Sequence, residues 1–197
     1  MIYLASASPR RAELLRQIGV QFTVLPADID ERARDNESIE ALVQRLAHDK
    51  ALAALARIDT VHPDDLVLAA DTLIGVDGEI IGKPCSAIDC ANILSRLSGR
   101  QHQVYSAVAL ADSAGRVMQR TSINQIKFRP MQAEEIRYYC QSEEPMDKAG
   151  AYAIQGFAAV FIEHLSGSYS SVMGLPLFDT AQLLAEAGQP PILIEQV

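Results

Sequence analysis

Apolar positions recur along the chain with two spacings, and segments with the pattern of strands alternate with segments that have the pattern of helices. Residues 66–70 form an unbroken apolar run, which suits a strand buried in the centre of a sheet. Residues 38–56 carry apolar side chains three or four positions apart, which is typical of a helix with one buried face. This alternation predicts an α/β fold.

The same patterns place the other elements. Strands are expected at residues 2–5, 21–25, 66–70, 73–76, 79–81, 104–110, 117–128 and 158–165, and helices at 9–18, 38–56, 87–97, 133–141 and 177–187. Asp77-Gly78 lies between two of the strands and is a strong signal for a hairpin turn. Residues 28–37 form a polar loop rich in charge, and no stretch has the composition of a linker. Residues 1–197 are therefore expected to form a single domain.

The segment Ser6-Ala7-Ser8-Pro9-Arg10-Arg11 joins the first strand to the first helix. Ser8 has the position of the helix cap, and proline follows at the first helical position. The start of a helix offers free backbone N–H groups and a positive dipole, and hydroxyl and guanidinium groups there add donors that match phosphate oxygens. Ser8, Arg10 and Arg11 are therefore candidate phosphate ligands. The alternative is an ordinary helix start with both arginines in solvent.

Two acidic features are candidates for chemistry. Asp71 follows the apolar run 66–70, and the ligands of α/β sheets collect at the carboxyl ends of strands. A carboxylate there can bind a metal or orient a water molecule, and an aspartate that only caps a turn is the alternative. The loop residues Asp28, Asp30 and Glu31 form a carboxylate cluster, which is either part of a magnesium site completed by substrate phosphates or a solvated run of charge.

Two lysines and a glycine-bounded loop add further candidates. Lys83 stands in Gly82-Lys83-Pro84, a tight loop after the expected hairpin. Lys50 lies near the middle of the helix at 38–56, where an ordinary surface lysine is an equal alternative. The loop at 147–156 has glycines that allow its backbone to approach a ligand, and Gln155 within it could hydrogen-bond a base edge through its amide. An irregular connection is the alternative for this loop.

Composition narrows the class of protein. The formal net charge is −8, so a nucleic-acid partner is not expected, because binding to a phosphate backbone needs a basic surface. No stretch has the roughly 18 uninterrupted apolar residues of a membrane span, so no membrane partner is expected either. The first residues lack the pattern of a signal peptide and read as a strand. We therefore expect a cytoplasmic protein.

The cysteines and histidines indicate the redox state of the thiols and the type of metal that the protein could bind. Cys85, Cys90 and Cys140 show no C-x-x-C spacing and are expected to be reduced thiols, in keeping with a reducing compartment. The four histidines are scattered without the spacing of zinc ligands. Any metal should therefore be a hard cation held by oxygen, Mg²⁺ or Mn²⁺.

Taken in order, these segments resemble the Maf family of nucleotide pyrophosphatases. The matching segments are residues 6–11, 30–31, 46–51, 70–72, 82–84, 97–99, 147–152, 154–156 and 174–177. The resemblance implies a two-lobed, ITPase-like α/β fold with a twisted mixed sheet, flanking helices and a central cleft. It also implies hydrolysis of a nucleoside triphosphate between its α and β phosphates, which releases a monophosphate and pyrophosphate.

The resemblance also implies roles for individual residues. Asp71 matches the proton acceptor, and Glu31 with Asp71 is expected to hold the divalent cation, Mg²⁺ or Mn²⁺; whether Asp71 is chiefly base or metal ligand stays open. The positions that match triphosphate ligands are Ser8, Arg10, Arg11, Lys50 and Lys83. A homodimer is an expectation at the level of the family.

Three positions indicate which base is bound. Arg10, Thr72 and Gln155 match the branch that resembles dTTP/UTP pyrophosphatases, so dTTP and UTP are the expected substrates. The chain departs from the family pattern at Cys85 and at Ser170-Ser171, and we expect these changes to tune binding. The alternatives are a pyrophosphatase for 7-methyl-GTP or another modified nucleotide, and a nucleotide-sensing regulator of cell division without turnover.

Overall fold

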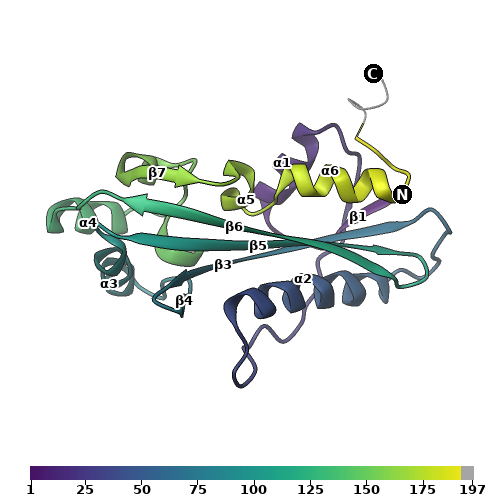
Figure 1. Ribbon diagram of the computed structural model, residues 1–197, viewed down its shortest axis with the longest axis horizontal. Helices are drawn as coiled ribbons and strands as arrows, with labels where there is room; N and C mark the ends of the chain where they lie inside the picture. Colours follow the sequence, from purple (N-terminus) through teal and green to yellow (C-terminus); the bar gives the residue numbers. More distant parts are fainter. Residues whose placement is uncertain (192–197) are drawn as a thin grey trace.

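The structure is a computed structural model that describes residues 1–191. Its centre is a seven-stranded mixed sheet in the order β2-β1-β3-β5-β6-β7, with β4 paired to β3. The strands are β1 (Ile2–Leu4), β2 (Thr23–Val24), β3 (Leu66–Val76), β4 (Glu79–Ile81), β5 (Gln101–Asp112), β6 (Val117–Phe128) and β7 (Ile162–Ser166). The predicted α/β fold, with a twisted mixed sheet flanked by helices, is confirmed (Figure 1).

The helices flank this sheet and connect its strands. They are α1 (Pro9–Gln17), α2 (Ile39–Leu55), α3 (Ala87–Leu97), α4 (Ala133–Cys140), α5 (Tyr169–Met173) and α6 (Leu177–Glu186), with short 3₁₀ turns at η1 (Ala149–Ala151) and η2 (Phe157–Phe161). Among residues 1–191, no helix combines the length and the apolar character that crossing a membrane requires.

Three long antiparallel strands, β3, β5 and β6, form the spine of the molecule (Figure 1). Helix α2 packs on one face of these strands, where alanines on both the helix and the sheet allow a close approach. Helices α1 and α6 cover the other face near the N-terminus, over a core that includes Leu15, Leu68 and Leu183. At the far end, α3 and α4 enclose a separate core with Leu94, Phe128 and others. The spine therefore joins two lobes.

One edge of β3 is open in its middle. Strand β1 pairs with it only over Leu66–Leu68, and β4 pairs with it only from Ile74 onward. Between these two partners, residues 70–73 face no strand of the described chain on that edge, while the other edge stays paired to β5. The open segment lies at the junction of the two lobes, and Asp71 and Thr72 are within it.

The position of Asp71 in its strand corrects the sequence analysis. The pattern predicted separate strands at 66–70 and 73–76 with Asp71 at a strand end, but β3 is one strand of 11 residues and Asp71 lies inside it. Asp71 and Thr72 pair with Ala107 and Ser106 of β5 in unbroken register. Two polar side chains interrupt the apolar pattern without interrupting the backbone ladder, because that ladder uses only main-chain groups.

A second correction concerns residues 158–165, which were expected to form one apolar strand. The first part is the 3₁₀ turn η2, and only Ile162–Ser166 form strand β7. Ala158 and Phe161 are buried whereas Val160 between them is exposed, which is the three-residue period of a 3₁₀ helix and not the alternation of a strand. The short helix α5 was not predicted at all.

The prediction that the cysteines are reduced is wrong for two of the three. Cys90 of α3 and Cys140 of α4 form a disulfide, with their Cα atoms 5.8 Å apart, and Cys85 is a free, exposed thiol. The two residues are 50 positions apart in sequence, and the packing of α3 on α4 brings them within the distance that a disulfide allows. Sequence spacing alone could not reveal this packing.

Reduction of the Cys90–Cys140 bond is expected to lower the free energy of unfolding by about 2–4 kcal/mol, because the bond restricts the unfolded chain. Urea unfolding of the protein with and without a phosphine reductant measures this difference. The Cys85→Ser variant is the control, since it removes the exposed thiol and should preserve the difference. Equal urea midpoints for the oxidised and reduced protein would contradict the expectation.

Candidate active site

A cavity of about 440 Å³ lies beside the open segment of β3. Its wall is contributed by the start of α1, the loop before α2, α2 itself, the β3–β4 hairpin and the loops around η1 and α5. The cavity is lined by most of the residues singled out for chemistry from the sequence: Ser8, Arg10, Arg11, Glu31, Lys50, Asp71, Thr72, Lys83 and Gln155. Asp28 and Asp30 of the expected carboxylate cluster do not line it, and Asp30 instead forms an ion pair with Arg32. Segments far apart in the chain therefore converge on one site.

Lys50 is the centre of the charged part of this cavity. Its Nζ lies 2.6 Å from Oδ1 of Asp71 and 2.6 Å from Oε1 of Glu31. Lys50 is only 9% exposed, because it lies on the face of α2 that packs against the sheet, in line with Leu46, Ala47 and Ala54. Burial of a lysine on this face costs free energy, because the ammonium loses its water, unless ion pairs compensate for that loss. The reading of Lys50 as an ordinary surface residue is therefore wrong.

Glu31 closes the charged cluster from the loop side. The hydrogen bond from Lys50 lowers the pKa of the Glu31 carboxyl, and the positive charges of Lys50, Lys83 and Arg11 lower it further. Glu31 is more exposed than Asp71, with side-chain exposures of 60% and 9%. The cluster thus has one enclosed and one solvent-facing carboxylate.

Arg11 is held in place by the loop that precedes α6. Its Nε donates to the carbonyl oxygen of Gly174 at 2.9 Å, and its Nη1 donates to Oγ of Ser6 at 3.3 Å. Burial lowers the pKa of Arg11, while the charge of Asp71 acts in the opposite direction. Gly174 has a φ of 118°, a conformation that a residue with a side chain adopts only with strain, so the glycine permits this contact.

Ser8 has the predicted cap position of α1, but its side chain makes no capping hydrogen bond. Its backbone N–H donates instead to Oγ of Ser6 at 3.2 Å. The Ser8 hydroxyl therefore remains available to a ligand at the start of the helix, where the dipole favours an anion.

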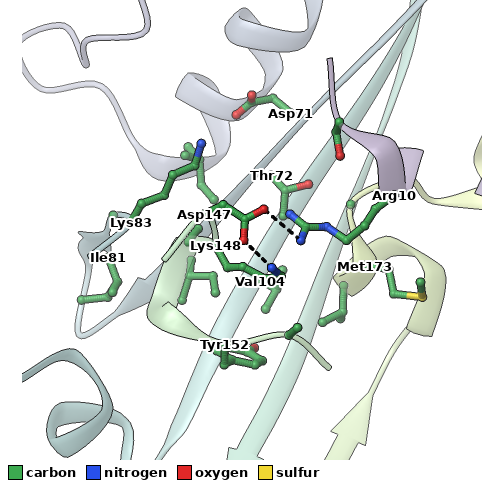
Figure 2. A pocket seen from close by; sticks show the side chains of 18 of the residues that line it. Arg10, Asp71, Thr72, Ile81, Lys83, Val104, Asp147, Lys148, Tyr152 and Met173 are labelled. Carbon is green, nitrogen blue, oxygen red and sulfur yellow. Dashed lines mark hydrogen bonds and ion pairs between the residues drawn. The ribbon is translucent and has the colours of Figure 1, made fainter. Parts of the chain in front are cut away.

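Arg10 contacts the loop between α4 and η1 across the cavity. Its Nη1 lies 3.5 Å from Oδ2 of Asp147, and Figure 2 shows these two side chains pointing toward one another. Lys148 forms an ion pair with Asp147 and donates to the carbonyl oxygen of Glu144 at 2.9 Å. Burial raises the pKa of Asp147, but the hydrogen bond from Lys148 and the positive charges of Lys148 and Arg10 together outweigh burial and leave the pKa below its ordinary value.

The far end of the cavity is largely apolar. Figure 2 shows Asp71 at one end of the view and Tyr152 at the other, with Thr72 between them. Side chains of Ile81, Val104 and Met173 line this second part. A charged end joined to an apolar end suits a molecule with a polyanionic part and a flat ring.

Tyr152 is backed by a buried histidine. Nε2 of His102 lies 2.8 Å from the hydroxyl oxygen of Tyr152, and both rings pack edge-on against Phe128. Nδ1 of His102 has no hydrogen-bond partner among the described residues. Burial lowers the pKa of His102 to about 4. The histidine therefore belongs to the core as a neutral ring.

Stability is expected to fall as the pH drops from about 6.5 to about 4. The unfolded chain binds a proton at His102 near its ordinary pKa of 6.5, whereas the folded protein binds it only near 4. Between these values the unfolded state holds more protons, so acid favours unfolding, by up to roughly 3 kcal/mol. Urea unfolding at several pH values in this range measures the free energy of unfolding of the wild-type protein and of His102→Gln. The free energy of the variant should depend less on pH, and an equal pH dependence in the two proteins would contradict the prediction.

The carboxylates of the cavity fit a divalent cation. Glu31 and Asp71 already place two oxygens around the single cationic Nζ of Lys50. Among residues 1–191, no three histidine, cysteine or acidic side chains gather into a complete metal site. Mg²⁺ is commonly held by one or two carboxylates together with substrate phosphates and water. This donor set therefore suits a cation that arrives with a phosphate ligand.

Several site residues were missed as individual candidates. Asp147, Lys148 and Gly174 line the cavity and lie in the segments that matched the family, so the motifs pointed to the right loops. Ser106 was not noticed at all, although it contacts Thr72. It lies inside a strand of small apolar residues, and only the register of β3 with β5 brings it to the site.

Comparison with known proteins supports a single family. A family model described as "Maf-like protein" matches residues 1–187. The chain is 54% identical over 199 residues to a dTTP/UTP pyrophosphatase of Aromatoleum aromaticum, covering 96% of each chain. It is 48% identical over 188 residues to a dTTP/UTP pyrophosphatase of Chromobacterium violaceum, covering 95% of this chain and 94% of the relative.

A solved structure shares the fold. The HAM1 protein from Coxiella burnetii superposes with a TM-score of 0.50 at 17% identity, over 94% of this chain and 98% of that one. This likeness concerns the architecture alone. The sequence matches go further, and they confirm the resemblance drawn from the order of the motifs: the chain belongs to the Maf family.

Proposed function

We propose that this chain is a nucleoside triphosphate pyrophosphatase that hydrolyses dTTP and UTP to the monophosphate and pyrophosphate. One observation carries the proposal: Arg10, Arg11, Lys50 and Lys83 line the same cavity as the carboxylate of Asp71. Such a concentration of cations in a chain of net charge −8 suits a polyphosphate. Guanidinium and ammonium groups match phosphate oxygens in charge and in hydrogen-bond geometry.

In the proposed reaction, the cationic side chains hold the triphosphate and Asp71 orients a water molecule. Oδ1 of Asp71 is occupied by Lys50, while Oδ2 accepts no hydrogen bond from the described residues and is available to water. The water oxygen forms a bond to the α phosphorus, the bond from that phosphorus to the bridging oxygen breaks, and Asp71 receives the proton. Pyrophosphate leaves in line with the attack.

The proposed cofactor is Mg²⁺ or Mn²⁺, held by Glu31 and Asp71. Bound there, the cation would neutralise charge on the phosphate oxygens. Lys50 hydrogen-bonds Asp71 and forms an ion pair with Glu31, so it keeps the carboxylates together before substrate arrives.

Two features support a pyrimidine base. The relatives named dTTP/UTP pyrophosphatase are 54% and 48% identical to this chain. Arg10, Thr72 and Gln155, which matched that branch in sequence, all line the cavity. The proposed partner, a small-molecule nucleoside triphosphate, is a metabolite of the cytoplasm, so we propose that the protein is cytoplasmic.

The test is a panel of triphosphates that includes dTTP, UTP and 7-methyl-GTP, assayed for pyrophosphate with Mg²⁺, with Mn²⁺ and with EDTA. We expect dTTP and UTP to give the highest kcat/KM, and EDTA to abolish turnover. Preference for 7-methyl-GTP would support the other branch of specificity. Binding without turnover of any nucleotide would support the sensing role, and release of orthophosphate in place of pyrophosphate would contradict cleavage between the α and β phosphates.

A further inference from the structure

Thr72 and Asp71 are neighbours in β3, yet they serve different parts of the cavity. Successive side chains of a strand point to opposite faces. Asp71 points to the face covered by α2, where Lys50 binds it. Thr72 points to the other face, toward Ser106 of β5 and the loop that contains Gly174. Its hydroxyl oxygen is therefore part of the cavity wall on the side away from α2.

A chain of hydrogen bonds fixes the direction in which the Thr72 hydroxyl donates. Oγ of Ser106 lies 2.7 Å from the carbonyl oxygen of Ser171 and 3.0 Å from Oγ1 of Thr72. A carbonyl oxygen can only accept, so Ser106 gives its single proton to Ser171. Ser106 must then accept from Thr72, and the Thr72 proton points into the protein.

The side chain of Ser171 is itself held by a directional network. Oδ1 of Asn124 accepts from the backbone N–H of Ser168 at 2.7 Å, and Nδ2 of Asn124 donates to the carbonyl oxygen of Val104 at 3.2 Å. These two backbone partners settle the orientation of the Asn124 amide, whose Nδ2 also donates to Oγ of Ser171 at 2.8 Å. Ser106, Asn124 and Ser171 are each 0% exposed, so water does not compete for these bonds.

Thr72 therefore presents only lone pairs to the cavity. An oxygen of that kind repels a phosphate oxygen, which also presents lone pairs, and it attracts an N–H group. The apolar side chains of Val104, Tyr152 and Met173 line the same cavity, as a compartment for a flat ring would require. Among pyrimidines, uracil and thymine carry an N–H at N3, whereas cytosine carries a lone pair there.

We propose that Ser106 is a positioning residue for base selection: by accepting the Thr72 proton, it fixes Thr72 as an acceptor that selects the N3–H edge of uracil and thymine over cytosine. The inference rests on the proposed function and adds to it the edge of the nucleobase that the protein recognises. It also assigns a role to a buried residue that touches no substrate.

The experiment compares UTP with CTP, which differ only at the edge formed by N3 and C4. The wild-type protein should favour UTP in kcat/KM by about 10-fold or more, and Ser106→Ala should reduce that ratio by at least about 5-fold, because the freed Thr72 hydroxyl can turn and donate to cytosine. Ser122→Ala is the matched control. Ser122 pairs with Ser106 in register on β6 but donates to Asn124 and not to Thr72, so its removal should leave the ratio unchanged.

A purely structural role for Ser106 would lower kcat/KM for both nucleotides equally, and an unchanged ratio in Ser106→Ala would overturn the inference. A second probe needs no variant: 3-methyl-UTP lacks the N3 proton and should be rejected by the wild-type protein as CTP is. Hydrolysis of 3-methyl-UTP at the rate of UTP would also overturn the inference.

The failure of this inference is separable from the failure of the proposed function. If the wild-type protein hydrolyses no pyrimidine triphosphate, the proposed function fails. Calorimetric titration with UMP and CMP then tests the base selection alone, with the same shift of ratio expected in Ser106→Ala. Equal affinities of the wild-type protein for UMP and CMP would overturn the inference independently of turnover.

Discussion

Asp71→Asn is expected to lower kcat for dTTP hydrolysis by about 10³-fold while the protein stays folded, since general-base catalysis contributes roughly 10²–10⁴-fold. An amide has nearly the same shape as a carboxylate but cannot take a proton from water at neutral pH. Its oxygen can still accept the hydrogen bond from Lys50. Lys50 also keeps its ion pair with Glu31, so the loss should appear chiefly in kcat and only modestly in thermal stability, which a steady-state assay of pyrophosphate release and a melting curve can separate.

Asp77→Asn provides the control for this substitution. Asp77 directly follows β3, in the turn to β4, and its side chain is exposed. Its φ is 53°, a conformation that asparagine tolerates well. The same change of carboxylate to amide there should leave kcat within about twofold of the wild-type value, as for an ordinary surface substitution. Retention of most of the wild-type kcat in Asp71→Asn would remove Asp71 from the catalytic role.

Lys50→Met is expected to have the largest effect on stability, lowering the free energy of unfolding by about 3–5 kcal/mol. The substitution leaves Asp71 without its cationic partner in an enclosed site, with the carboxylate of Glu31 nearby. Removal of one partner of a buried ion pair is costly because the other charge remains desolvated. Urea unfolding measures the loss, and kcat/KM for dTTP should fall by about 10²-fold or more as a phosphate ligand is removed.

Two further variants test the cause of this loss. The double variant Lys50→Met/Asp71→Asn removes both charges and should recover part of the stability, which a double-mutant cycle expresses as a coupling between the two side chains. Lys127→Met breaks an exposed pair with Glu163, whose side chains are 46% and 49% exposed, and should cost less than about 1 kcal/mol. Equal urea midpoints for Lys50→Met and Lys127→Met would contradict the structural importance of the buried pair.

The site was more predictable from the sequence than were the details of the fold. Motif order brought Arg10, Lys50, Lys83 and Asp71 together as candidates, and the structure places them around one cavity. The reason is that each lies in a short segment whose chemistry is local: a helix start, a charged helix position, a tight turn or a polar break in a strand. Their roles in binding and catalysis stay predictions until the variants are measured.

What the sequence could not supply depends on contacts between distant segments. The Cys90–Cys140 bond depends on how α3 packs against α4. The direction of the Thr72 hydroxyl depends on Ser106 and, through it, on the loop around Ser171. The continuity of β3 through Asp71 depends on its pairing with β5, which overrides the polar interruption in the local pattern.

The alternation of Asp71 and Thr72 on one strand has a consequence for how such a site can diverge. The residue assigned to the reaction and the residue assigned to the base are adjacent along the backbone but separated by the thickness of the strand. A substitution at position 72 can therefore remodel nucleobase preference while the water-orienting carboxylate keeps its surroundings on the α2 side. A shift of β3 by a single residue, in contrast, would exchange the two faces and destroy both capacities at once.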